Sequence, residues 1–166
     1  MRTFKVEQLE RAFLEGMVVG YVVGGTPTDT PDLPGWKQII TKVIGTPAFE
    51  LRDAWTTNGD YSSGFTTLSL DGEVLWIMHY GGYYEQDAHA FLKTALHEQY
   101  FNGGIFNGGR GPDVFETEDM LYINDVKQPE FIHFHGKEQI VGRKNGKGHI
   151  FGQHWYHGQA LIPLIN

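Results

Sequence analysis

Two histidines near residue 134 have a spacing that suits metal binding. His133 and His135 are two residues apart, so on a strand both side chains point to one face, and Glu138 follows three residues later. The next predicted strand carries the histidines that could supply a third ligand, namely His149, His154 and His157. Three histidines around an open position form the kind of site that holds a catalytic metal ion.

Histidines at such positions are more often half-exposed strand residues or satisfied polar groups. No set of three has a decisive ligand spacing. The chain also contains no cysteine, which excludes thiolate ligands and a thiol nucleophile. The sequence therefore predicts that the chain binds no metal and carries no cofactor.

Two carboxylates lie on strand faces that are otherwise apolar. Asp53 alternates with Leu51 and Trp55 on one predicted strand, and Glu138 lies on another. Two carboxyl groups in one cleft can divide the roles of general acid and general base. An acid in such a place is either paired with a base, for which Arg110 is a candidate, or has a raised pKa and a function. The sequence leaves both alternatives open.

Arg110 lies in a Gly-Gly-Arg-Gly-Pro loop, residues 108–112. Glycines let a ligand approach the backbone, and a guanidinium offers a planar fork to a carboxylate or phosphate. The alternative is an arginine that clamps the acidic end of a strand.

These residues together predict a ligand site. It would lie between the hairpin face that bears Trp76 and Tyr80 and the final strands, with Arg110 at its rim. The predicted ligand-binding residues are Asp53, Trp76, Tyr80, Arg110, Glu138 and His157. The same residues could instead close a dry core around an internal Arg–Glu pair.

Helical and strand periodicities predict the elements that would hold this site. Apolar residues three and four apart predict an N-terminal helix over residues 4–17 and a central helix over residues 87–101. Asp71-Gly72 and Asn145-Gly146 are two-residue turns typical of hairpins. The fold expected is α+β, a curved antiparallel sheet of six or more strands with the central helix packed on one face.

The first hairpin, residues 64–82, also predicts which face the central helix covers. Pairing Leu70 with Glu73 separates two sets of side chains. One set is Leu68, Leu70, Leu75 and Ile77, and the other is Phe65, Thr67, Val74, Trp76, Met78 and Tyr80. The helix is expected on the leucine face, which leaves the aromatic face for the ligand.

Length and charge limit the kind of protein this is. With 166 residues the chain suits a single domain, residues 1–166. Its net charge of −7 argues against direct binding of nucleic acid. No run of about 18 apolar residues predicts a membrane helix, and the charged N-terminal residues are unlike a signal peptide. We expect a cytoplasmic protein.

Six short motifs, taken in order, resemble a small bacterial domain of unknown function that occurs alone or behind a helix-turn-helix module in transcriptional regulators. They are LRDAW (51–55), DGEVLWIMHYGG (71–82), FLKTAL (91–96), RGP (110–112), FHGKEQI (134–140) and YHGQALI (156–162). The resemblance covers nearly the whole chain and implies no activity. It departs from the family where YHGQ stands in place of a closing glycine pair.

The association with regulators favours a non-catalytic module that binds a small molecule or serves sensing or interaction. The first alternative is a metal- or carboxylate-dependent enzyme that acts on a small polar substrate. The second is a structural module that forms a homodimer through exposed strand edges.

Overall fold

The computed structural model describes residues 3–45 and 47–165, and a nine-stranded antiparallel sheet dominates it. Along the sheet the strands follow the order β2, β3, β4, β5, β6, β10, β9, β8 and β7. Their bounds are β2 Thr28–Asp29, β3 Lys37–Lys42, β4 Glu50–Asn58, β5 Tyr61–Leu70, β6 Glu73–Tyr84, β7 Val114–Glu116, β8 Met120–Glu130, β9 His133–Lys144 and β10 Lys147–Ala160. A separate parallel pair, β1 (Phe4–Lys5) and β11 (Leu164–Ile165), joins the two ends of the described chain.

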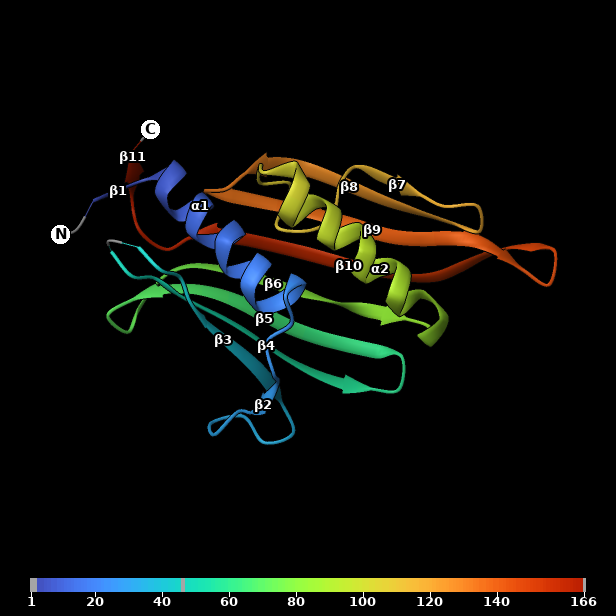
Figure 1. Cartoon of the computed structure of the whole chain (residues 1–166), viewed down its shortest axis with the longest axis horizontal. Coiled ribbons are helices and arrows are strands. Elements are labelled where there is room, and N and C mark those ends of the chain that lie inside the picture. The colour runs from blue at the N-terminus through green and yellow to red at the C-terminus, as the bar shows by residue number, and fades with distance from the viewer. Residues whose placement is uncertain (1–2, 46, 166) are drawn as a thin grey trace.

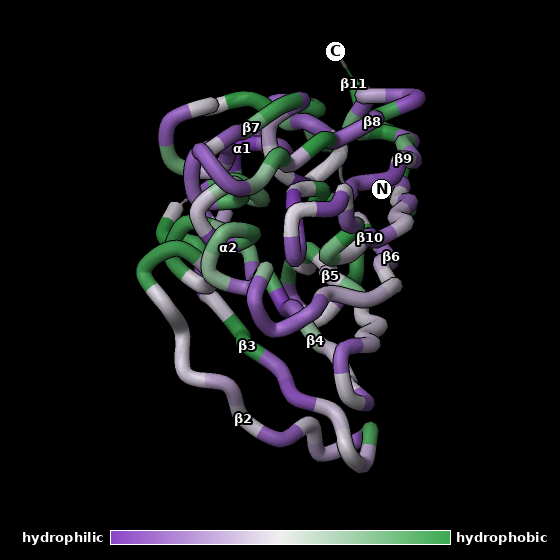
Figure 2. Tube along the Cα trace, turned by 90° about the vertical axis from the view of Figure 1, so that its right-hand side faces the viewer, coloured by the Kyte–Doolittle hydropathy of each residue, from purple (hydrophilic) through white to green (hydrophobic). Residues whose placement is uncertain are grey.

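Two helical segments lie against one face of this sheet (Figures 1 and 2). The first is α1 (Val6–Met17), continued by a π-helical turn, η1 (Val18–Val22). The second runs through η2 (Gln86–Ala88), α2 (His89–His97) and η3 (Glu98–Gly103). The predicted fold class is confirmed, and the sheet curves around the helices, with β7 and β8 at one end and β2 and β3 at the other (Figure 2).

Helix α1 forms because its apolar stripe has a sheet face to cover. Leu9, Phe13 and Met17 are at most 4% exposed, while Glu7 and Glu15 face solvent. The ring of Phe13 lies 4.9 Å from that of Trp76 on β6. Trp76 in turn stacks on Phe131 and Phe134, with centroids 5.0 and 5.5 Å away. This aromatic cluster joins α1 to the sheet.

Both predicted hairpin turns are confirmed. Asp71 and Gly72 have φ of 52° and 80°, and Asn145 and Gly146 have φ of 54° and 75°. Positive φ at both central residues is the type I′ geometry, which matches the twist of antiparallel strands. The two turns therefore join β5 to β6 and β9 to β10 without a long loop.

The predicted division of the first hairpin into two faces is wrong, because the ladder contains a bulge. Leu70 pairs with Glu73 as expected, but Leu68 then pairs with Trp76, and Leu75 is left without a partner. The extra residue moves every later side chain of β6 to the other face. Phe65 consequently lies opposite His79, and Leu68 shares its face with Trp76.

The helices cover the face of Trp76, Met78 and Tyr80, so the expectation that the helix covers a leucine face and leaves the aromatic face free is also wrong. The helical layer therefore lies over the face on which the sequence predicts the ligand site. Among the described residues no helix has the length and apolarity needed to cross a membrane.

Candidate functional site

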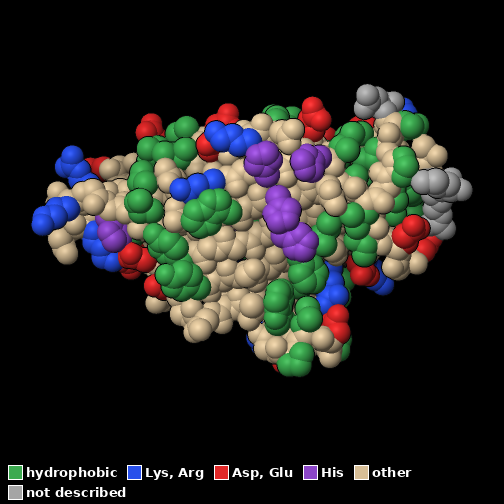
Figure 3. Space-filling view, turned by 180° about the vertical axis from the view of Figure 1, so that it is seen from behind, with side chains coloured by type: hydrophobic (Ala, Val, Ile, Leu, Met, Phe, Trp, Pro, Cys, Tyr) green, Lys and Arg blue, Asp and Glu red, His purple; other side chains and the backbone are tan. Residues whose placement is uncertain are grey.

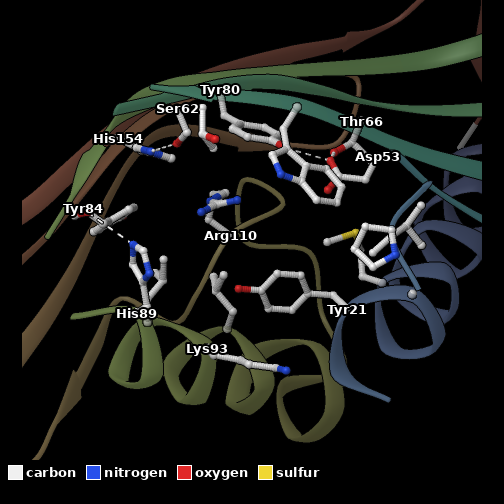
Figure 4. Close-up of a pocket in the computed structure, with 18 of the residues that line it drawn as sticks. Tyr21, Asp53, Ser62, Thr66, Tyr80, Tyr84, His89, Lys93, Arg110 and His154 are labelled. Atoms are coloured by element: carbon white, nitrogen blue, oxygen red, sulfur yellow. Dashed lines mark hydrogen bonds between the residues drawn. The ribbon is translucent and has the colours of Figure 1, made fainter. Parts of the chain in front are cut away.

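A cavity of about 420 Å³ lies between the sheet and the helical layer (Figure 4). Its sheet side is formed by β4, β5, β6 and β10, and η1 and α2 close it from the helical side. The polar and aromatic residues that line it include Tyr21, Asp53, Trp55, Ser62, Thr66, Tyr80, Tyr84, His89, Lys93, Arg110 and His154. Aromatic rings and a few polar groups are the usual walls of a small-molecule site.

Two adjacent glycines shape the loop that holds Arg110 in the cavity. Gly108 and Gly109 both have positive φ, of 63° and 70°, and Gly109 presses against Met78, whose sulfur would lie 2.9 Å from an added Cβ. Tyr100 donates its hydroxyl to the Gly109 carbonyl at 2.8 Å, and the Gly111 amide donates to the Tyr122 hydroxyl at 2.9 Å. These two hydrogen bonds hold the backbone on either side of Arg110 in place.

The guanidinium of Arg110 pairs with Glu138 of β9, which is fully buried. Nε of Arg110 donates to Oε1 of Glu138 at 3.0 Å, and a second guanidinium nitrogen donates to the same oxygen. Tyr84 also donates to Oε1, at 2.8 Å, and Tyr122 donates to Oε2. Burial alone would raise the pKa of Glu138, but the charge and hydrogen bonds of Arg110 hold it below the usual value.

Asp53 of β4 is the second carboxylate of the cavity. Its Oδ1 accepts hydrogen bonds from Thr66 Oγ1 at 2.8 Å and from the Tyr80 hydroxyl at 3.0 Å. Its Oδ2 has no hydrogen-bond partner among the described residues. Burial raises the pKa of Asp53 despite these two donors, and it raises the pKa of Tyr80 well above its ordinary value.

His154 of β10 is 4% exposed and has one unsatisfied ring nitrogen. Its Nε2 lies 3.1 Å from the Ser62 hydroxyl, while Nδ1 lies 3.9 Å from Oε1 of Glu138, too far for a hydrogen bond. Burial, followed by the charge of Arg110, lowers the pKa of His154 to about 4. The imidazole is therefore neutral at physiological pH.

Two further residues complete the helical wall. Tyr21 of η1 has no hydrogen-bond partner for its hydroxyl in the described chain, and burial raises its pKa to about 12. His89 of α2 places Nε2 3.3 Å from the carbonyl of Tyr84. Figure 4 shows both side chains on the helical side, across the cavity from Tyr80 and Asp53.

The structure brings together three of the six predicted ligand-binding residues. Asp53, Tyr80 and Arg110 line the cavity, and Glu138 lies behind Arg110 as its counter-ion. Trp76 lies away from the cavity, fully buried in the aromatic core. His157 is exposed and stacks on His79, 5.3 Å away, on the far face of the sheet.

Sequence reasoning did not place Tyr84, Ser62 or Tyr21 in the ligand site, and it considered His154 only as a third metal ligand. A signal existed for two of them. Tyr84 follows Tyr80 by four residues, and His154 precedes Tyr156 by two, so on a strand each shares a face with another aromatic residue. No sequence signal marks Ser62 or Tyr21, because the place of Ser62 depends on the pairing of β5 with β6, and that of Tyr21 on the packing of η1 against the sheet.

Of the histidines considered as metal ligands, only His154 lines the cavity among the described residues. Histidine side chains gather on the rear face of the sheet (Figure 3), where His79, His133, His135 and His157 are exposed. His149 bonds instead to Glu85, at 2.6 Å. Across residues 3–45 and 47–165 no three His, Asp or Glu side chains are placed to hold one metal ion.

The order Ser62, His154, Glu138 has the residue types of a nucleophile, base and orienting acid. The 3.9 Å gap between His154 and Glu138 leaves the imidazole unoriented, and a histidine with a pKa of about 4 is a weak base. Glu138 already accepts from Arg110 and two tyrosines. The geometry therefore provides a polar, aromatic binding surface more readily than an activated serine.

Comparison with known proteins gives a family without an activity. A family model described as a domain of unknown function, DUF5680, matches residues 53–161. Neither the curated proteins nor the solved structures contain a match to this chain. The matched segment begins at Asp53 and includes Tyr80, Arg110, Glu138 and His154, so most of the sheet side of the cavity lies within it. The chain belongs to the DUF5680 family of domains of unknown function.

Proposed function

We propose that this domain binds a small organic molecule, without converting it, in the cavity between the sheet and the helices. The observation that carries the proposal is Asp53, a carboxylate in an aromatic cavity with one oxygen bonded twice and the other unpaired. A volume of about 420 Å³ falls in the range typical of small-molecule sites.

Unpaired polar groups at the cavity support this reading over a dry core. Buried polar atoms in native proteins are almost always hydrogen-bonded, because leaving one unpaired costs about 1–3 kcal/mol. Here Nδ1 of His154 is buried without a partner, whereas Oδ2 of Asp53 and the hydroxyl of Tyr21 lack protein partners in the described chain but belong to partly exposed residues. A bound ligand with matching donors and acceptors would satisfy them.

Catalysis by a carboxylate is the second candidate function. The raised pKa of Asp53 suits a general acid, and the favouring observation is its position beside an open cavity. A mechanism with two carboxylates would need Glu138 as the second acid or base. Glu138 already accepts hydrogen bonds from Arg110, Tyr84 and Tyr122, which argues against that mechanism. Turnover of a bound compound, lost in Asp53→Asn with binding retained, would establish the enzyme reading.

A sensory role and a homodimer are two further proposals for this domain. A sensory role is supported by η1 and α2, which both line the cavity, so that a ligand would contact both helical segments. A homodimer would pair the edge strands of the sheet. These edge strands are short, since β2 has two residues and β7 has three, which offers few backbone groups for pairing.

A blocking substitution at the mouth of the cavity tests the main proposal. Thr57 is exposed and lines the cavity, whereas its neighbour Asn58 is exposed and does not. Indole, added at millimolar concentration to isotope-labelled protein, is expected to shift the amide resonances of cavity residues. Thr57→Trp should remove these shifts, and the matched control Asn58→Trp should retain them. Shifts scattered over the surface, or equal in both variants, would contradict binding in the cavity.

A further inference from the structure

We infer that the ligand of this cavity carries a protonated amine, which binds the free oxygen of Asp53 beside the aromatic wall. The inference rests on the proposed function and adds the chemical class of the ligand. Two observations support it: Arg110 is already paired with Glu138, and one oxygen of Asp53 accepts no hydrogen bond from the described residues.

Arg110 already forms an ion pair with Glu138. Its guanidinium pairs with Glu138 at the base of the cavity, and Arg110 and Glu138 are 8% and 0% exposed. A ligand carboxylate or phosphate would have to compete with a fixed, buried partner for that guanidinium. It would also bring its charge close to Glu138, which repels it strongly where water is scarce.

The carboxylate of Asp53 forms no ion pair in the described chain, although the charge of Arg110 acts on it from a longer distance. In the described chain its only side-chain partners are the neutral hydroxyls of Thr66 and Tyr80, and no cationic nitrogen lies within ion-pair distance of it. Apart from the histidines His89 and His154, the other charged side chains of the lining are Arg110, Asp60 and Lys93. Together with Asp53 and the counter-ion Glu138 they make three acids and two bases, a sum of one negative charge when Asp53 is ionised.

The hydrogen-bond geometry of Asp53 also favours a cationic donor. Both protein donors use Oδ1, which fixes the carboxyl plane and leaves Oδ2 to accept. An ammonium group has three donors and no acceptor, so it can bind Oδ2 without leaving an unpaired lone pair of its own. A charge-assisted bond of this kind is about twice as strong as a neutral one.

Aromatic rings around Asp53 supply the second feature that an organic cation needs. Tyr21 and Trp55 line the cavity together with Asp53, and the faces of such rings attract ammonium groups. Tyr80 is less available, because its ring already lies 5.4 Å from the guanidinium carbon of Arg110. A ligand amine is therefore expected between Asp53 and the rings of Tyr21 and Trp55.

Three probes that share one indole ring separate the amine from its alternatives: tryptamine (cationic), tryptophol (neutral) and indole-3-acetate (anionic). Calorimetric titration near neutral pH is expected to show tryptamine binding about tenfold or more tightly than tryptophol, as a charge-assisted bond implies. Indole-3-acetate should bind most weakly. Asp53→Asn should weaken tryptamine about tenfold and change tryptophol by less than about threefold. The control Asp60→Asn removes the same charge at the lining and should change tryptamine binding by less than about threefold.

The possible results separate the two proposals. If tryptophol or indole-3-acetate binds best and Thr57→Trp blocks it, the cavity is a ligand site and the amine inference is wrong. If tryptamine binds best but Asp53→Asn leaves its affinity unchanged, Asp53 is not its partner and the inference is also wrong. If none of the three binds at millimolar concentration, both the inference and the proposed function are contradicted.

Discussion

Arg110 and Glu138 form an ion pair in which neither side chain is more than 8% exposed. The two residues come from a glycine-rich loop and from a central strand, 28 positions apart in the chain. Their charges neutralise each other at the base of the cavity. This pairing leaves the partly buried Asp53 and the exposed Asp60 as the carboxylates of the lining that a ligand can reach. The following predictions test that arrangement.

Glu138→Gln should destabilise the protein strongly. Removing one partner of a buried pair leaves the other charge uncompensated, which typically costs about 3–5 kcal/mol. Urea unfolding followed by tryptophan fluorescence measures the loss. The double variant Arg110→Met/Glu138→Gln should lose less unfolding free energy than the two single variants lose together. The exposed control Glu118→Gln should change the unfolding free energy very little. Additive losses would show that the two side chains are not coupled.

His154 should make stability depend on pH in the mildly acidic range. Its pKa of about 4 in the folded chain lies below the ordinary 6.5, so the unfolded chain gains a proton first as pH falls. Stability is then lost progressively between those two values, by about 3 kcal/mol in total. The difference between the unfolding free energies of the native chain and His154→Gln should show this slope. The exposed control His133→Gln should not alter it.

Asp53→Asn should become relatively more stable as pH rises. Because burial raises the pKa of Asp53, the folded chain resists its ionisation, and the native protein loses stability as pH rises from the ordinary pKa to the folded one. The variant lacks this loss, so its advantage should be larger near pH 7 than near pH 3. Unfolding free energies at the two pH values check it. An advantage that is larger at the acidic value would show that the pKa of Asp53 is lowered instead.

Gly109→Ala should destabilise the protein more than Gly104→Ala. Both glycines have similar positive φ, 70° and 65°, so both substitutions carry a backbone cost of about 1–2 kcal/mol. Only at Gly109 would the new Cβ meet Met78, with sulfur 2.9 Å away, whereas nothing lies near it at Gly104. The excess loss, about 1–3 kcal/mol, should appear in the melting temperature and in weaker indole binding. Equal losses would mean that the Arg110 loop tolerates displacement.

The purified protein should contain no stoichiometric transition metal. His133 and His135 are exposed on the face of the sheet opposite the helices, away from the cavity. Elemental analysis after dialysis tests this. The double change His133→Ala/His135→Ala should leave both unfolding free energy and indole binding unchanged. One equivalent of zinc, iron or nickel that disappears in this variant would restore the metal-dependent alternative.

Several elements followed from the sequence because local chemistry alone specifies them. The stripe of Leu9, Phe13 and Met17 has helical spacing, and Asp71-Gly72 and Asn145-Gly146 can adopt the positive φ of a tight turn. Composition excluded thiolate chemistry. Asp53, Tyr80 and Arg110 were predicted to share a site because acidic, aromatic and glycine-flanked basic residues in strands and loops are typical of one.

Tertiary structure alone decided which side chains meet in the cavity. The bulge at Leu75 reverses the faces of β6, and a count of alternating residues cannot reveal it, because an extra residue leaves the hydrophobic pattern plausible on both sides. His154 rather than His157 faces inward for the same reason, since strand register selects between the two parities. Tyr21 reaches Asp53's cavity only through the packing of η1 on the sheet, a contact between distant segments whose free energy comes from burial and not from local sequence.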